Sequence, residues 1–363
     1  MNDNIYFAFG ELALDVYGYE EEYDGGLQAD GGVSAYNALY YLASMGNECI
    51  ALGGVGYDKK NINLTGAKMS KQPIIHKLGH VYSQANIAMA SLEEAGVNCT
   101  HIGYLDKAIN MFFINKKETG IEIGRVDPNT GDTSIKWGGV PNNFPAEMVD
   151  KKVALIVSNF EPSTSVFISK TKSRFTGDKS YGRGKVYPIC SMDITNKNIF
   201  SKYPIEWVMT FLSRVDLVQC NENTFEELLL KHNQESDTTL TKEEFIRETG
   251  AKVFTITKGK NGAEFYYLDD SRQLNHVSVQ PKPGHVVHDE VDSTGAGDAF
   301  HAVLLESYMN NLEKGRHLDD YYFRKTFEKA NALSREVIKH RGARIPVGLV
   351  KYALKGFDGP SFE

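Results

Sequence analysis

The sequence DSTGAGDAF at residues 292–300 holds the residue types best suited to chemistry in this chain. Two carboxylates bracket a run of small residues, and an apolar pattern with helical spacing follows, so the run predicts the start of a helix. Backbone amides at a helix start lack partners and carry the positive end of the helix dipole. Gly295, Ala296 and Gly297 can therefore present donors to an anion such as phosphate. Asp298, on the first turn, is placed to take a proton from a hydroxyl beside that anion.

This run resembles the signature of the ribokinase-like (pfkB) carbohydrate kinases, which transfer the terminal phosphoryl group of ATP to a hydroxyl of a sugar or nucleoside. The resemblance implies that Asp298 is the catalytic base and that the turn at 295–297 stabilises the transferred group. It also implies ATP with Mg²⁺ as the cofactor. A monovalent cation (K⁺) near Asp292 is a further option that the family suggests.

The N-terminal part contains residues that the same resemblance assigns to the sugar. Asp15 follows a short apolar run, and Gly31-Gly32 leads into a helical pattern with Asn37 in its first turns. In ribokinase-like enzymes such a Gly-Gly turn and Asn contact the sugar hydroxyls together with the early Asp, which implies substrate contacts for Asp15, Gly32 and Asn37. The chain departs from the family at Val33, where the second Gly falls. The identity of the sugar therefore stays open.

Positions in the C-terminal half resemble those that contact the nucleotide in the family. Asn221 begins a segment similar to Asn-x-x-Glu, although Thr224 stands where the family has the acidic residue. Thr257 and Gly259 lie in a turn similar to T-x-G-x-x-G, and Asn331 lies on a helix that resembles the one near the adenine ring. Judged from the residues alone, the segment at Asn221 can also be a helix cap, and the turn at Thr257 and Gly259 can also be a hairpin turn.

These residues need elements that bring them to one place. Short apolar runs predict buried strands at 5–10, 152–157, 186–192, 216–220 and 252–256. Near-continuous apolar strands separated by helical patterns are typical of a parallel sheet covered on both faces. Ligands of open α/β sheets bind beyond the carboxyl ends of the strands. We therefore expect the polar residues at these strand ends to line one cleft with the helix start at 295–298.

The fold implied by the resemblance is α/β, a doubly wound and mostly parallel sheet in a three-layer α/β/α arrangement with a small β lid. We expect a single ribokinase-like domain over residues 1–363. The lid is expected at about 15–30 and 97–126, because family members carry one there. Exposed lid strands often pair between subunits, so a homodimer through the lid is expected.

Composition limits the partners and the compartment. The chain has 40 basic and 47 acidic residues and a net charge of -7, which argues against a nucleic-acid surface. No apolar run is long enough to span a bilayer, and the N-terminus does not resemble a signal peptide, so no membrane role is expected. Four cysteines without CxxC spacing favour a reduced cytoplasmic protein. His285 and His288 lack a third ligand, so no metal site is expected.

The expected function is ATP-dependent transfer of the γ-phosphoryl group to a hydroxyl of a small sugar. A nucleoside kinase of the same fold stays open, with Tyr17, Tyr19 or Tyr36 as a platform for the base, as does a kinase for a pyridoxal-like vitamin. A third hypothesis is a catalytically silent nucleotide-binding or regulatory protein, which the departures at Val33 and Thr224 motivate.

Overall fold

The computed structural model describes residues 4–19, 28–57, 84–106, 111–117, 120–125, 151–177, 188–269, 271–283, 285–287 and 290–357. Strands are β1 (Asn4–Tyr19), β2 (Gln28–Gly32), β3 (Glu48–Tyr57), β4 (Asn98–Asp106), β5 (Met111–Lys117), β6 (Gly120–Arg125), β7 (Lys152–Val157), β8 (Ile189–Ile194), β9 (Leu217–Asn221), β10 (Val253–Thr257), β11 (Ala263–Leu268) and β12 (Leu274–Val279). Helices are α1 (Ser34–Ser44), α3 (Gln84–Glu94), α4 (Pro162–Gly177), α5 (Ile205–Leu212), α6 (Glu222–Glu235), α7 (Lys242–Thr249), α8 (Ala296–Glu313), α9 (Asp320–Val337) and α10 (Val347–Ala353).

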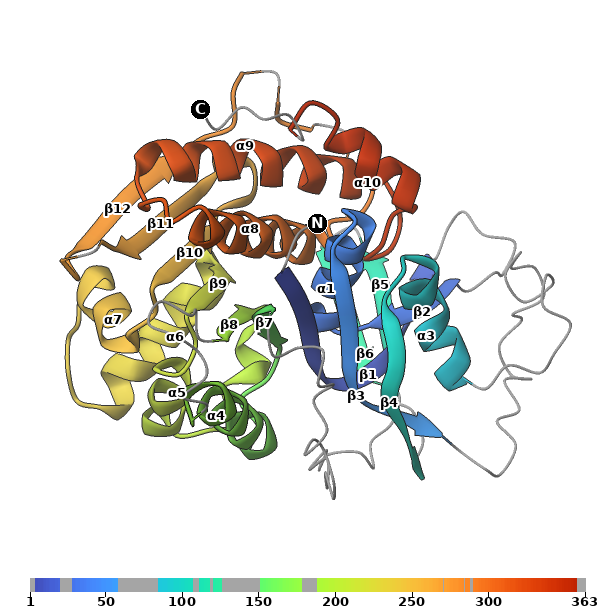
Figure 1. The fold of residues 1–363 in the computed structure, drawn as a ribbon, viewed down its shortest axis with the longest axis horizontal. Helices are drawn as coiled ribbons and strands as arrows, with labels where there is room; N and C mark the ends of the chain where they lie inside the picture. The colour runs from blue at the N-terminus through green and yellow to red at the C-terminus, as the bar shows by residue number, and fades with distance from the viewer. Residues whose placement is uncertain are drawn as a thin grey trace, which may run out of the picture.

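One mixed sheet runs through the molecule (Figure 1). From β4 to β10 neighbouring strands run parallel in the order β4-β3-β1-β7-β8-β9-β10. β11 and β12 then extend the sheet as antiparallel neighbours. The predicted mostly parallel α/β sheet is therefore confirmed.

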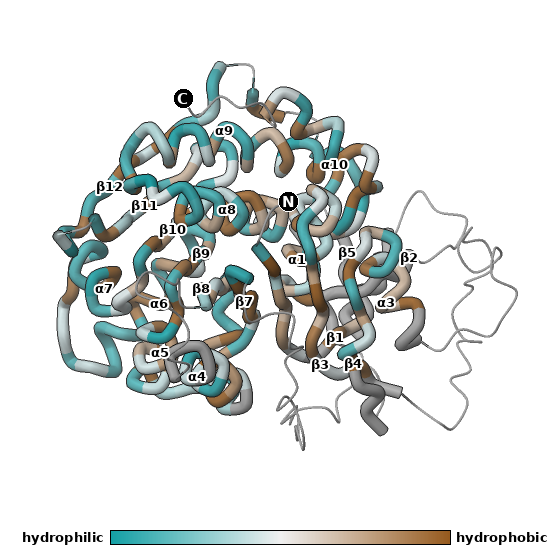
Figure 2. Tube along the Cα trace, in the orientation of Figure 1, coloured by the Kyte–Doolittle hydropathy of each residue, from teal (hydrophilic) through white to brown (hydrophobic). Residues whose placement is uncertain are grey.

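Alternate residues of the central strands are buried on opposite faces of this sheet. In β1, Tyr6 and Ala8 pack on one side, and Ile5 and Phe7 pack on the other. Residues of α1, α3, α8, α9 and α10 belong to the first side, and residues of α4 to α7 to the second. Figure 2 shows the apolar strands between helices whose outer faces are more hydrophilic. This two-sided cover is the predicted three-layer arrangement.

The second half of β1 leaves the central sheet and forms a smaller one. It pairs antiparallel with β2, where Leu14 lies opposite Gly31, and parallel with β5, where Leu14 lies opposite Met111. β6 adds to β5 as an antiparallel neighbour. β4 falls inside the stretch 97–126 but pairs with β3 in the central sheet, so in that stretch the smaller sheet holds β5 and β6. Residues 20–27 of the expected lid lie outside the described residues.

A buried tyrosine sets the position of α1 on the sheet. Tyr36 has no exposed surface, and its hydroxyl lies 2.9 Å from the carbonyl oxygens of both Gly10 and Leu52. A Cβ at Gly53 would lie 2.4 Å from that hydroxyl and 2.0 Å from the Gly10 oxygen. Only glycine at this position lets α1 approach β1 and β3 so closely. Because Tyr36 is fully buried, it is not available as a platform for a nucleoside base.

Candidate active site

The turn before α8 is held against the loop at 341–344. Gly295 has φ 81°, and a Cβ there would lie 2.2 Å from the Ala343 oxygen. The buried Asp292 carboxylate accepts hydrogen bonds from the amides of Thr294, at 2.9 Å, and Gly342, at 3.0 Å. Glycine and this carboxylate together fix where α8 begins.

Backbone amides at this helix start are available to an anion. The Ala296 amide donates to the Ser293 oxygen at 3.2 Å, which closes the turn. In the part of the chain that the structure describes, no acceptor is bonded to the amides of Gly297 and Asp298. These two donors lie at the positive end of α8, so the predicted anion site is best supplied by Gly297 and Asp298.

The side chain of Asp298 lies beside α1, on the same face of the sheet. It is 7 % exposed. Ser34 Oγ donates to its Oδ1 at 2.5 Å, and Asn37 Nδ2 donates to its Oδ2 at 2.8 Å. Two of the predicted site residues, Asp298 and Asn37, are therefore in direct contact.

A buried arginine fixes which way the Asn37 amide faces. Arg344 Nε donates to Asn37 Oδ1 at 3.0 Å, and its guanidinium lies over the Tyr40 ring and donates to Ser91 of α3. A guanidinium has donors only, so Asn37 must turn its oxygen to Arg344 and its NH₂ group to Asp298. Arg344 was not among the predicted site residues. Its positive charge, close to Arg341 in the loop at 341–344, was the only signal for it.

The environment of Asp298 suits a base that works near neutral pH. Burial raises the pKa of Asp298 from 3.8 to about 6. Hydrogen bonds from Ser34 and Asn37 and the charge of Arg344 act in the opposite direction and favour the carboxylate. A general base is most effective when its pKa lies close to the operating pH.

A second carboxyl group, on Asp193 at the end of β8, lies at the same place. A Cβ on Gly297 would be 3.5 Å from Asp193 Oδ2, and Gln219 Nε2 of β9 donates to the Gly297 oxygen at 2.9 Å. Burial, and then the charge of Asp298, raise the pKa of Asp193 well above its ordinary value. Asp193 directly follows the predicted strand at 186–192 but was not among the predicted site residues. Its type at a carboxyl strand end was the available signal.

Candidate nucleotide residues lie at the ends of the next strands and on α9. Asn221 caps α6, since its Oδ1 accepts from the Thr224 amide at 2.9 Å, and its position lies opposite Thr257 in the β9–β10 pair. Gly259, with φ 53°, begins the turn after β10. Asn331 lies one turn before Ser334, whose Oγ donates to the Ala296 oxygen at 2.9 Å. The structure thus bears out the cap at 221–224 and the turn at 257–262, and it brings α9 to the start of α8.

Candidate sugar residues lie where β1 and β2 pair. Asp15 lies opposite Asp30 of β2 and Phe112 of β5, and Gly32 lies opposite Ala13. Gly32 leads directly to Val33, the residue before α1, which adopts φ 84° and ψ 130°. A β-branched residue rarely adopts this conformation. The departure from the family pattern is therefore also a place of backbone strain.

Comparisons with known proteins identify the architecture. Residues 195–348 match the sequence model of the pfkB family carbohydrate kinases. A fructokinase from Xylella fastidiosa with bound ATP superposes with a TM-score of 0.68, at 14% identity and 98% coverage of both chains. Residues 195–348 thus match a pfkB family domain, and the fold of the chain is ribokinase-like. An Arabidopsis thaliana ribokinase complexed with ribose and ATP gives a TM-score of 0.62, at 15% identity, covering 98% of this chain and 99% of that one.

The pfkB assignment agrees with a curated relative over a limited stretch. The chain is 34% identical over 103 residues to the probable fructokinase-6, chloroplastic, of Arabidopsis thaliana. That match covers 28% of this chain and 24% of the relative, so it spans about a quarter of the relative's length. The family resemblance seen in DSTGAGDAF is therefore confirmed. No described helix of this ribokinase-like chain combines the length and the apolar character needed to cross a bilayer.

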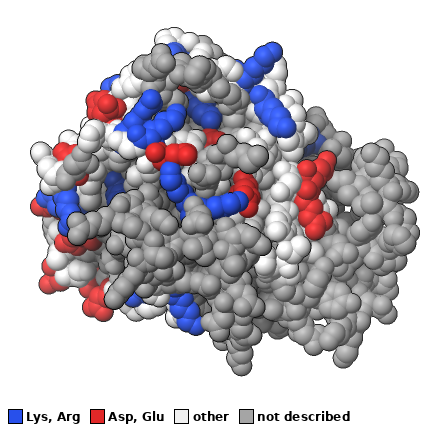
Figure 3. All heavy atoms as spheres, in the orientation of Figure 1, with Lys and Arg blue, Asp and Glu red and all other residues white. Residues whose placement is uncertain are grey.

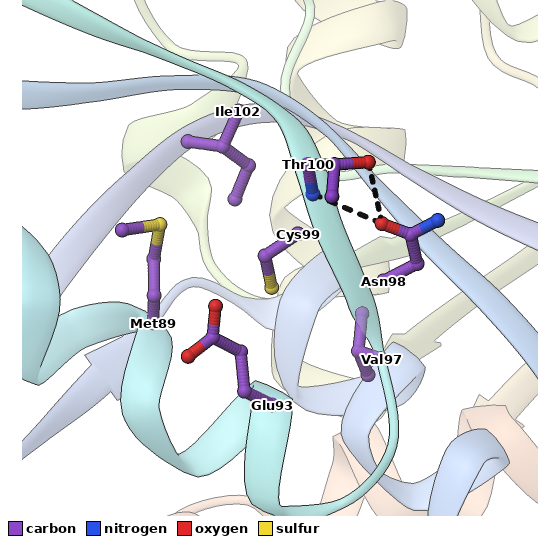
Figure 4. Close-up of a pocket in the computed structure, with 7 residues that line it drawn as sticks. All are labelled: Met89, Glu93, Val97, Asn98, Cys99, Thr100 and Ile102. Carbon is purple, nitrogen blue, oxygen red and sulfur yellow. Dashed lines mark hydrogen bonds between the residues drawn. The ribbon is translucent and has the colours of Figure 1, made fainter.

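A hollow of about 410 Å³ lies between α3 and β4 (Figure 4). The residues that line it are Met89, Glu93, Val97, Asn98, Cys99, Thr100 and Ile102. Burial and the charge of Glu93 raise the pKa of the Cys99 thiol to about 12, so this thiol is not a nucleophile near neutral pH. The groups suited to phosphoryl transfer lie at the start of α8 instead.

On the face drawn in Figure 3, described Lys, Arg, Asp and Glu side chains are interspersed.

Proposed function

We propose that this protein is a kinase that transfers the γ-phosphoryl group of ATP to a hydroxyl of a small sugar. The observation that carries the proposal is the contact of Asp298 with Ser34 and Asn37, next to the available amides of Gly297 and Asp298 at the start of α8. A base and an anion site thus lie within one helical turn. This is the arrangement that in-line phosphoryl transfer requires.

In the proposed reaction, Asp298 takes the proton of the acceptor hydroxyl as the oxygen–phosphorus bond forms. The amides of Gly297 and Asp298 stabilise the charge on the phosphoryl group, and ADP leaves as the bond to its oxygen breaks. Mg²⁺ would arrive with the nucleotide and neutralise part of the phosphate charge. Asn221, Thr257, Gly259 and Asn331 remain the proposed nucleotide contacts.

Asp15, Gly32 and Asn37 remain the proposed sugar contacts. The NH₂ group of Asn37 already donates to Asp298. If Asn37 also contacts the sugar, the same side chain both binds the sugar and positions the base. K⁺ activation beside Asp292, pairing of two subunits through the lid and a cytoplasmic location also stay proposals. The four cysteines are buried and free, which suits a reducing compartment.

The test is an ADP-release assay with Mg-ATP and a panel of hexoses, pentoses, nucleosides and pyridoxal. We expect turnover with a sugar, and we expect Asp298→Ala to lower kcat by roughly 10² to 10⁴, the usual contribution of a positioned acid or base. Circular dichroism on both proteins would check that the fold is retained. Unchanged turnover in Asp298→Ala would refute the assignment.

The same panel separates the alternatives. Turnover confined to nucleosides would identify a nucleoside kinase of this fold. Calorimetric binding of ATP without turnover on any acceptor would favour a catalytically silent protein.

A further inference from the structure

The carboxyl groups of Asp298 and Asp193 meet at the Ser34 hydroxyl. Ser34 Oγ donates a hydrogen bond to Asp298 Oδ1. The same hydroxyl also interacts with the Asp193 side chain. It has one hydrogen, so it can donate to only one of the two groups at a time.

Few groups near Asp193 can compensate a negative charge there. Among the described residues, the titratable groups around it are Asp298, Cys220 of β9 and His301 of α8, which contacts Ser191 two residues before Asp193. Hydrogen bonds from Gln219 and Ser34 favour the Asp193 carboxylate, but burial and the charge of Asp298 act more strongly in the opposite direction. Burial lowers the pKa of His301 to about 4 and raises the pKa of the Cys220 thiol, so both are neutral near pH 7. Arg344 binds Asn37, and its charge acts on Asp298. Two ionised carboxylates would therefore share one buried place without a cation between them.

The position of Asp193 beside the anion site leads to the same conclusion. Its Oδ2 lies next to Gly297, whose amide is one of the available donors at the start of α8. An ionised carboxylate there would repel an incoming phosphate group. A protonated carboxyl group would not repel it.

We propose that Asp193 is a positioning residue that keeps a proton while Asp298 is ionised, and that Ser34 accepts from Asp193 and donates to Asp298. The Asp193 proton is not consumed in turnover, since the acceptor proton goes to Asp298. Because Asp193 donates to Ser34 and Ser34 donates to Asp298, Asp298 stays ionised and can act as the base. The proposal rests on the proposed kinase function for its effect on turnover, but the protonation of Asp193 can be tested without it.

The first test compares the wild type with Asp193→Asn, which mimics a neutral donor of the same shape, by thermal unfolding between pH 6 and 9. A carboxyl group whose pKa is raised in the folded state contributes stability at low pH that is lost as the pH rises. We expect the melting temperature of the wild type to fall over this range, and Asp193→Asn to fall less. Equal slopes for the two proteins would overturn the proposal, whether or not any turnover is found.

The second test follows kcat/KM against pH for the same pair with the active acceptor. We expect an alkaline decline of kcat/KM in the wild type, caused by ionisation of Asp193, and we expect this decline to be lost in Asp193→Asn. Asp193→Ala should lose about tenfold or more, as expected when a hydrogen bond in a charged network is removed. Inactive Asp193→Asn with a raised requirement for Mg²⁺ would instead identify a metal ligand and overturn the proposal.

Ser34→Ala separates the hydroxyl bridge from general damage. The Ser34 hydrogen bond lowers the pKa of Asp298, so its removal should shift the acid side of the kcat/KM profile upward from about pH 6. An unshifted profile would show that the hydroxyl does not join the two carboxyl groups.

Discussion

Gly295→Ala should be far more damaging than a glycine-to-alanine change usually is. Gly295 has φ 81°, and an L-residue in this conformation costs roughly 1 to 2 kcal/mol. A Cβ would also lie 2.2 Å from the Ala343 oxygen and 2.6 Å from the Ala343 Cα, both backbone atoms. Forcing extra volume into such a place costs a further ~1 to 3 kcal/mol. Together these estimates give a loss of about 2 to 5 kcal/mol in the free energy of unfolding.

A matched control lies beyond the other end of the same helix. Gly315 has φ 60°, and no atom lies within 4 Å of a Cβ built there. Gly315→Ala therefore carries the conformational cost without the clash. The entropy that Ala removes from the unfolded chain is common to both variants and cancels in the comparison.

The assay is equilibrium unfolding in urea, followed by circular dichroism, on the two variants and the wild type. We expect Gly295→Ala to be less stable than Gly315→Ala by about 1 to 3 kcal/mol, the cost of the clash alone. It should also lower kcat, because the clash moves the amides at the start of α8. Equal stability of the two variants would refute the close contact between the turn and the 341–344 loop.

Two further predictions concern Val33 and His301. Val33 has φ 84°, so Val33→Gly should be more stable than Val33→Ala. At the control position Ala35 in α1, Ala35→Gly should instead lower the free energy of unfolding by about 1 kcal/mol. Urea unfolding that favours Ala at both positions would contradict the strain at Val33. The pKa of His301 is lowered by burial from 6.5 to about 4, so it contributes stability above pH 6.5 that is lost as the pH falls toward 4, up to roughly 3 kcal/mol. His301→Gln should therefore lose less stability than the wild type between pH 7 and 4.5, and an identical loss would show that His301 is not buried as a neutral group.

Local sequence patterns were sufficient to predict several of the strands and the start of α8. The apolar runs at 152–157, 216–220 and 252–256 lie within one residue of β7, β9 and β10. Burial on both faces of a parallel sheet demands continuous apolar residues, and this demand is visible in a short window. DSTGAGDAF likewise combines the positive-φ glycine, the small residues and the carboxylate within one segment.

The roles of residues whose contacts depend on tertiary packing could not be predicted from such local patterns. For Asn221 the sequence allowed both a nucleotide contact and a cap; the structure shows the cap, with its oxygen on the Thr224 amide, and the nucleotide contact stays a proposal. Tyr36 was open as a base platform, and packing of α1 on the sheet buries it completely. In both cases the choice depends on which atoms the fold brings within hydrogen-bond distance.

What the sequence by itself determined is the set of residue types at one helix start, namely the carboxylate of Asp298 and the small residues before it, together with a parallel sheet to support them. Only the tertiary structure decided which groups surround Asp298. Ser34 precedes Asp298 by 264 residues, yet α1 and α8 pack side by side on one face of the sheet and bring them together. Arg344 follows Asn37 by 307 residues, and the loop at 341–344 brings the two into contact. Protonation is set by burial and by such neighbours, and neither is a property of the local sequence.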